Sequence, residues 1–287
     1  MINVVSCIDG SPGALAVCDA GAWASQRMAA PLQLLHVLDK SESPIHSDLS
    51  GSLGVDSREH LLEELVELDA KRSKLALEHG KLMLEAAKNR VAERAVEKDT
   101  LDISTLQRHG SLVESLLELQ DDTRLLIMGR LGESHAGQAL AVGSQLESVI
   151  RAVHKPILIT LDQFTVPNNF MIAFDGRSVT QNVLDTLIGS PLLKGLPCHL
   201  VAVNNTSLDR GPELQAAADK LTKARFTVSA TVLQGEMQSE LQRYQQEHGI
   251  ELMVMGAYGH SRIRRLFLGS NTTDMVSASS IPLIIVR

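Results

Sequence analysis

One glycine pattern occurs twice in this chain, and the two copies begin 127 positions apart. The second copy consists of residues 256–259 (GAYG) and, nine residues later, residues 269–271 (GSN). The first copy consists of residues 129–132 (GRLG) and, ten residues later, residues 143–145 (GSQ). Each copy follows a short apolar run and precedes a helical pattern. A strand that runs through glycines into a helix presents backbone N–H groups to a phosphate, so the pattern indicates a duplicated phosphate-binding unit.

The rest of the sequence repeats with the glycines. Asp9 and Asp175 each end an apolar run, and they lie 166 positions apart. Val37 and Val203, which end the next apolar runs, keep the same offset. The offset falls to 127 at the glycine pattern, so the first half carries roughly 40 extra residues in its middle.

Short apolar runs alternate with helical patterns along both halves. This order predicts βαβ units, a parallel sheet and helices on both of its faces. We expect an acidic first domain over 1–162 and a second domain over 168–287, joined by the linker 161–169 (LDQFTVPNN). The expected strands lie near 2–8, 32–38, 101–108, 124–129 and 156–161, and near 169–174, 198–203, 226–233, 251–256 and 282–286.

The extra residues of the first half lie within 40–98. They begin with a segment rich in Ser, Gly and Pro and continue as leucines spaced among charges. This pattern predicts one long helix or a helical pair, with Ser57 as its N-cap and acidic residues on its outer face. The apolar positions are Leu61, Leu62, Leu65, Leu68, Leu75, Leu82 and Val91.

Composition excludes several classes of protein. A net charge of −7 and 3% aromatic residues argue against nucleic-acid binding. No apolar stretch reaches the ~20 residues that span a bilayer, and the N-terminus lacks a secretory signal. Three separated cysteines and ten dispersed histidines suggest neither a disulfide framework nor a metal site. We expect a cytoplasmic protein with no membrane span.

The doubled pattern, with an Asp after the first strand of each half, resembles the universal stress protein family and its tandem subgroup. The resemblance implies two flavodoxin-like α/β domains, packed as a pseudo-dimer. Each would hold a five-stranded parallel sheet in the order 3-2-1-4-5. It also implies a stress-response role and, where the motif is intact, binding of ATP with or without Mg²⁺. The residues carried over for the second domain are Asp175, Val203, Gly256, Gly259, Gly269, Ser270 and Asn271. Arg262 of the intervening loop joins them as a candidate because arginine pairs well with a triphosphate.

A weaker second site follows from the first copy of the pattern. Its loop has one extra residue, Gln145 in place of Asn, and Glu133 where the second copy has arginines. Arginine pairs well with phosphates, whereas glutamate opposes them. Its candidate residues are Asp9, Val37, Gly129, Gly132, Gly143 and Ser144. In both copies the alternative is that the glycines serve ordinary turns and that the Asp residues form Asx-turns.

The sequence contains no recognised catalytic motif. There is no GxxxxGK[ST] loop and no GxSxG elbow, so ATP hydrolysis is expected to be weak at most. The leading interpretation is therefore a regulatory adenine-nucleotide-binding protein. The alternative is a protein whose two sites are vestigial and whose leucine-rich insertion binds a protein partner or an apolar ligand. The apolar C-terminal run could pair within the chain or in a homodimer.

Overall fold

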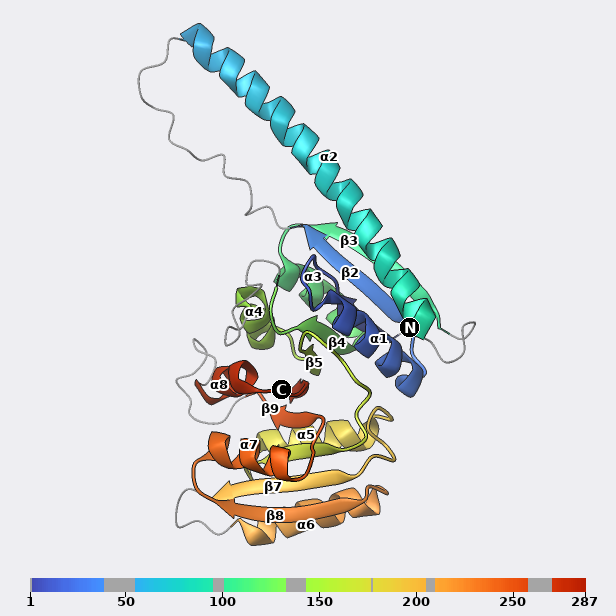
Figure 1. Ribbon diagram of the computed structural model, residues 1–287, viewed down its shortest axis with the longest axis vertical. Helices are drawn as coiled ribbons and strands as arrows, with labels where there is room; N and C mark the ends of the chain where they lie inside the picture. The colour runs from blue at the N-terminus through green and yellow to red at the C-terminus, as the bar shows by residue number, and fades with distance from the viewer. Residues whose placement is uncertain are drawn as a thin grey trace.

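A computed structural model describes residues 2–38, 55–94, 101–132, 143–176, 178–204, 210–257 and 270–287. These residues form one ten-stranded sheet with helices on both faces (Figure 1). The strand order is β3-β2-β1-β4-β5-β10-β9-β6-β7-β8. The first half therefore reads 3-2-1-4-5, and the second half repeats this order from the other end of the sheet.

The described residues of the first half form five strands. They are β1 (Asn3–Cys7), β2 (Leu32–Leu38), β3 (Ile103–His109), β4 (Thr123–Gly129) and β5 (Ile157–Thr160). Its helices are α1 (Ala14–Met28), α2 (Val55–Arg94), α3 (Leu112–Leu119) and α4 (Ser144–Ala152), with a short 3₁₀ helix, η2 (Gln120–Asp122).

The second half repeats the first without the long insertion. Its strands are β6 (Phe170–Phe174), β7 (Cys198–Asn204), β8 (Val228–Gln234), β9 (Met253–Gly256) and β10 (Leu283–Val286). Its helices are α5 (Ser178–Gly189), α6 (Gly211–Lys223), α7 (Met237–Glu247) and α8 (Ser270–Ala278). Every expected strand is present within about two residues of its predicted bounds, because short runs of β-branched and apolar residues favour strands.

Two apolar cores sandwich the sheet, and each core spans both halves. One core holds buried residues of α1, α2, α5 and α6, such as Trp23, Leu84 and Leu184. The other holds buried residues of α3, α4, α7 and α8, such as Leu146 and Met275. The predicted α/β class and the order of strands within each half are confirmed.

The halves join through their fifth strands. β5 and β10 pair antiparallel, with Leu283 opposite Ile159 and Ile285 opposite Ile157. The predicted pair of five-stranded sheets is thus one continuous sheet, and the C-terminal run pairs within the chain. The repeat is preserved in the register, since Val5 pairs with Gln33 and Met171 pairs with His199 at the offset of 166.

Side chains reinforce this seam. Arg27 donates hydrogen bonds to the carbonyl oxygens of Leu192 and Lys194. The rings of Trp23 and Phe164 pack with centroids 5.5 Å apart. Each contact joins α1 of the first half to the linker or to the second half, so the two halves are held by more than strand pairing.

The insertion forms a single helix, α2, that projects from the body (Figure 1). It begins at Val55, so the prediction of Ser57 as the N-cap is wrong. Its C-terminal part packs on the sheet through Gly80, Leu84 and Ala87. The described side chains before Gly80 are exposed or half-exposed. We call residues 55–79 the arm.

Two features fix α2 to the body. A Cβ on Gly80 would lie 2.7 Å from Cδ2 of His36, so only glycine permits this close approach to β2. Farther along, Arg90 donates two hydrogen bonds of 2.8 Å to the carboxylate of Asp19 on α1. The same carboxylate lies 3.3 Å from Arg94. The side chain of Asp19 is only 13% exposed, so this network is better shielded than a surface ion pair.

Candidate functional site

The candidate residues of each half lie at the carboxyl edge of that half of the sheet. In the first half, Asp9 follows β1, Val37 is near the end of β2, and Gly129 ends β4. In open α/β sheets, ligands bind outside the carboxyl ends of the strands, where the strand order reverses. Because β1 lies between β2 and β4, the predicted residues surround that point.

The equivalent positions of the second half surround the same point of its own sheet. Asp175 follows β6 and Gly256 ends β9, while Val203 is buried near the end of β7. The two halves match in detail, since Arg130 N–H donates to the carbonyl of Thr160 and Ala257 N–H donates to that of Val286. Both glycine patterns therefore leave the sheet in the same way.

In the first half, the Asp and the glycines contact one another. The carboxylate of Asp9 accepts hydrogen bonds from the backbone and the hydroxyl of Ser11, at 3.1 and 2.5 Å. This is the Asx-turn that the sequence left open as the alternative. A Cβ on Gly132 would lie 3.5 Å from the other carboxylate oxygen. Asp9 and Gly132 are thus brought together.

The start of α4 closes this loop. Gly143 N–H donates to the carbonyl of Arg130 at 3.0 Å, and a Cβ on Gly143 would lie 3.3 Å from the nitrogen of Gly132. Ser144 begins α4, although its side chain lies outside the described residues. Gly129, Gly132, Gly143 and the first turn of α4 therefore form one compact unit.

Arg130 has a role that the sequence did not predict. Its guanidinium donates to the carbonyls of Ser277 and Ser279, at 3.2 and 2.9 Å. These carbonyls lie at the C-terminal end of α8, where a cation is favoured by the helix dipole. Arg130 thus ties the first glycine pattern to the second half. The sequence did carry one signal for this role: the first copy has an arginine where the second copy has Ala257.

The second half arranges different groups at its edge. Arg210, which precedes α6, donates to the backbone carbonyl of Asp175 and so joins the ends of β6 and α6. Asn204 ends β7, and its side-chain oxygen is buried without a hydrogen-bond partner among the described residues. The first half has Leu38 at the equivalent position. The second edge therefore offers a buried acceptor that the first edge lacks.

Part of the predicted second site lies outside the described residues. These positions are Gly259, Arg262 and Gly269. Ser270 and Asn271 form the first turn of α8, but their side chains are also not described. What the structure does place at this edge is the end of β9, at Gly256, together with Asp175 and Val203.

The thiols are poorly suited to nucleophilic chemistry. Burial raises the pKa of Cys18 and Cys198 to about 12. Burial, with the nearby charge of Asp9, also raises the pKa of Cys7. A thiol reacts as its thiolate, so these side chains are unreactive near neutral pH. Within the described residues, no group of three His, Cys, Asp or Glu side chains is arranged to hold a metal ion.

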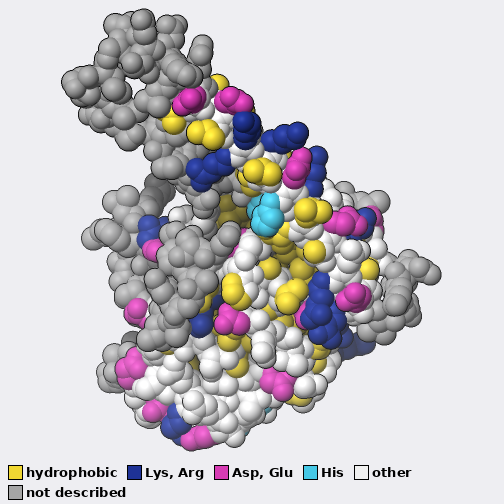
Figure 2. Space-filling model, turned by 45° about the horizontal axis from the view of Figure 1, so that its top comes forward, with side chains coloured by type: hydrophobic (Ala, Val, Ile, Leu, Met, Phe, Trp, Pro, Cys, Tyr) yellow, Lys and Arg dark blue, Asp and Glu magenta, His cyan; other side chains and the backbone are white. Residues whose placement is uncertain are grey.

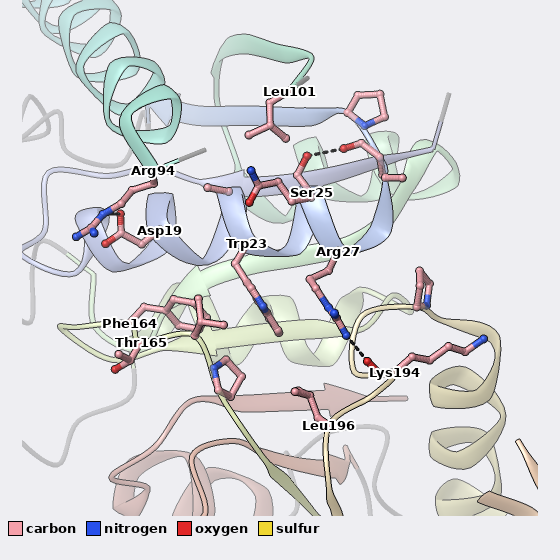
Figure 3. A pocket seen from close by; sticks show the side chains of 18 of the residues that line it. Asp19, Trp23, Ser25, Arg27, Arg94, Leu101, Phe164, Thr165, Lys194 and Leu196 are labelled. Atoms are coloured by element: carbon pink, nitrogen blue, oxygen red, sulfur yellow. Dashed lines mark hydrogen bonds and ion pairs between the residues drawn. The ribbon is translucent and has the colours of Figure 1, made fainter. Parts of the chain in front are cut away.

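A separate groove lies near the seam (Figure 3). Trp23 and Arg27 of α1, Phe164 of the linker, and Lys194 and Leu196 before β7 line it. All the loop segments that line it precede strands. It therefore lies away from the carboxyl ends, where the candidate residues gather. Arg27, which lines the groove, also donates hydrogen bonds to the backbone of the second half there.

This fold and its paired edges agree with comparisons to known proteins. A model of the universal stress protein family matches residues 1–160 and 200–287. The chain belongs to the universal stress protein family. One relative, universal stress protein Slr1230 of a Synechocystis species, is 34% identical, and the alignment covers 100% of both chains.

Solved structures show the same fold at lower identity. A universal stress protein from Archaeoglobus fulgidus superposes with a TM-score of 0.66 at 14% identity, covering 99% of this chain and 96% of that one. Protein PA1789 from Pseudomonas aeruginosa, described as functionally unknown, superposes with a TM-score of 0.61 at 11% identity. That alignment covers 100% of this chain and 92% of PA1789. No helix within the described ranges is both long and apolar enough to cross a bilayer.

Proposed function

We propose that this protein binds ATP, or a closely related adenine nucleotide, at the carboxyl edge of the second half. The observation that carries the proposal is the gathering of Asp175, Val203 and Gly256 at one reversal point of the sheet, in the half that keeps the full glycine pattern. In this position, an open α/β sheet offers a crevice between neighbouring strand ends.

The polar groups of this edge fit an adenosine. Adenine presents an amino donor, and the buried oxygen of Asn204 is an acceptor without a partner among the described residues. A buried acceptor that lacks a partner costs free energy, which a ligand donor would recover. The backbone of Val203 lies next to it at the end of β7, and the carboxylate of Asp175 can accept from ribose hydroxyls. Arg210 holds the backbone of Asp175 at this point.

The phosphates would lie beside Gly256 and the start of α8. A glycine at the end of β9 lets a ligand approach the backbone closely. The nine-residue helix α8 begins at Ser270, and the first N–H groups and positive end of a helix attract an anion. The intervening sequence supplies Arg262, Arg264 and Arg265, which suit a triphosphate.

We propose a regulatory role in the stress response, with weak hydrolysis at most, because no catalytic motif accompanies the glycine pattern. Any Mg²⁺ would be held mainly by the phosphates, since the described residues provide no cluster of carboxylates for it. The three separated, unpaired cysteines suit a reducing compartment, and we propose a cytoplasmic location.

Calorimetric titration of the full chain with ATP tests the proposal. The wild type is expected to bind, and Gly269→Val is expected to weaken binding at least about tenfold because a side chain would obstruct the phosphate loop. Gly189→Val is the matched control, since a Cβ at Gly189 would meet nothing within 4 Å and the residue ends α5. No binding by the wild type at millimolar ATP, or equal binding by Gly269→Val, would contradict the proposal.

A further inference from the structure

The arm of α2 and the residues just beyond it expose a row of leucines. Leu68, Leu75 and Leu82 follow one another at intervals of seven, and they are 60%, 66% and 70% exposed. Figure 2 shows apolar side chains between charged ones along the projecting helix. Surface leucines scattered singly need no explanation, but a seven-residue repeat is the pattern of a helix that packs against another helix.

The row lies on the side of α2 that faces away from the body. Leu75 and Leu84 are nine residues apart, which is half a turn around a helix of 3.6 residues per turn. Leu84 is buried against the sheet, whereas Leu75 is exposed. A second helix can therefore lie along the row of leucines and continue beside residues 80–92. It would not collide there with the body of the chain to which this α2 belongs.

We propose that the arm pairs with the arm of a second copy of this chain, as an antiparallel two-stranded coiled coil. Together with the leucines, Leu65, Arg72 and His79 complete the alternating three- and four-residue spacing. An antiparallel alignment places each of these three opposite a leucine of the second copy. The pairs are Leu65 with Leu82, Arg72 with Leu75, and His79 with Leu68, and each pair occurs twice.

The charges select this direction. In a parallel pair, Arg72 would face Arg72 in the apolar seam, and Glu64 would flank Asp69. In the antiparallel pair, Arg72 packs its methylene chain against Leu75, and Lys71 flanks Glu78 of the second copy. One unfavourable pair remains, Glu64 with Glu85, and it lies away from the centre. The arm is therefore complementary to a second arm when the two run antiparallel, but not when they run parallel.

The sheet leaves few other places for a second copy. The fifth strands of both halves, which could serve as edges, are paired with each other through Ile159 and Leu283. Among the described strands, β3 and β8 lie at the ends of the sheet. This proposal is independent of nucleotide binding at the second half, because α2 packs on β2 and β3 of the first half.

Sedimentation equilibrium of the full chain tests the pairing. The wild type is expected to approach twice 31.1 kDa at concentrations up to about 100 μM. Leu68→Glu combined with Leu75→Glu is expected to weaken the dimer at least about a hundredfold, because charge replaces buried leucine. Val66→Glu is the matched control. Val66 is 69% exposed on the same arm, but it lies half a turn away from Leu75 and should leave the dimer intact.

A spin label at Glu85→Cys tests the direction. Residue 85 faces residue 62 of the second copy, so two labels would lie 23 residues, or about 35 Å, apart along the helices. A distance below about 20 Å would indicate a parallel pair and overturn the proposal. A wild type that stays monomeric, or a dimer that survives Leu68→Glu with Leu75→Glu, would also overturn it.

Discussion

In the first half, the Asp and the glycine loop contact one another, and Arg130 reaches across the seam. Asp9 accepts from Ser11, and Gly143 donates to the carbonyl of Arg130. In the second half, the equivalent strand ends carry Asp175, Val203 and the acceptor Asn204. One sheet order thus supports two different edges. The difference suggests that duplication allowed the first copy to specialise in holding the molecule together while the second kept the features of a ligand site.

The largest expected effect comes from breaking the seam that both halves share. Ile284→Asp would place a charge in the buried β5–β10 joint, because Ile284 is buried and pairs with Leu158. We expect a loss of about 4 kcal/mol or more in the free energy of unfolding, measured by urea denaturation. Val166→Asp, on the exposed linker, should change it by less than about 0.5 kcal/mol. Equal effects would mean that the halves are stable without the joint.

A smaller loss is expected from the contact that distinguishes the first copy. Arg130→Ala removes the hydrogen bonds to the carbonyls of Ser277 and Ser279. Hydrogen bonds from a charged donor suggest a cost of about 2 kcal/mol in unfolding free energy. Arg130→Lys keeps the positive charge but lacks the forked guanidinium. Its unfolding free energy should therefore lie between those of the wild type and Arg130→Ala. An unchanged urea midpoint for Arg130→Ala would show that this contact does not stabilise the seam.

The two Asp residues give a direct comparison of the edges. Asp175→Ala is expected to weaken ATP binding about tenfold, because it removes a charged acceptor from the proposed site. Asp9→Ala should leave affinity within about twofold, because that carboxylate is engaged by Ser11. Calorimetry on both variants measures the difference. A larger loss for Asp9→Ala would move the proposed site to the first half.

The smallest expected effect is on the pH dependence of stability. It concerns His199 and its equivalent in the first half, Gln33. Burial, and then the nearby His248, lower the pKa of His199, whose ring contacts the hydroxyl of Tyr244 at 3.0 Å. The folded state therefore favours neutral His199. Its contribution is complete above the unfolded pKa of about 6.5 and declines as pH falls below that value. His199→Gln installs the residue found at Gln33 of the first half.

Urea midpoints at pH 7.5 and pH 5.5 measure this effect. The wild type should lose more stability between the two pH values than His199→Gln does, because glutamine does not titrate. His199→Asn serves as a second neutral replacement. An identical pH response in all three proteins would mean that His199 does not contribute to it.

Much of the fold followed from local pattern. The apolar runs located the strands, and the offset between Asp9 and Asp175 is the same offset that the sheet register keeps. A single helix over 55–94 was one of two predicted outcomes. No proline interrupts it, and Gly80 is tolerated because the helix approaches β2 closely there.

The remaining features depend on contacts between distant segments. The antiparallel joint of β5 and β10 leaves no local signal, because both strands are short and apolar in either arrangement. The contact of Arg130 depends on where α8 ends relative to β4. At Asp9, the sequence left both an Asx-turn and a ligand role open, since Asp-Gly-Ser suits either one. The structure shows the turn.

The antiparallel joint also has a consequence for how the two halves can change. All strands of each half run parallel to its own fifth strand, and the fifth strands run in opposite directions. The carboxyl edges of the two halves therefore face opposite ways, and no single small ligand can bridge them. A mutation that remodels one edge reaches the other through the elements between them, such as the contact of Arg130 with the end of α8. Because the two carboxyl edges lie on opposite sides of the sheet, each half can acquire its own ligand specificity.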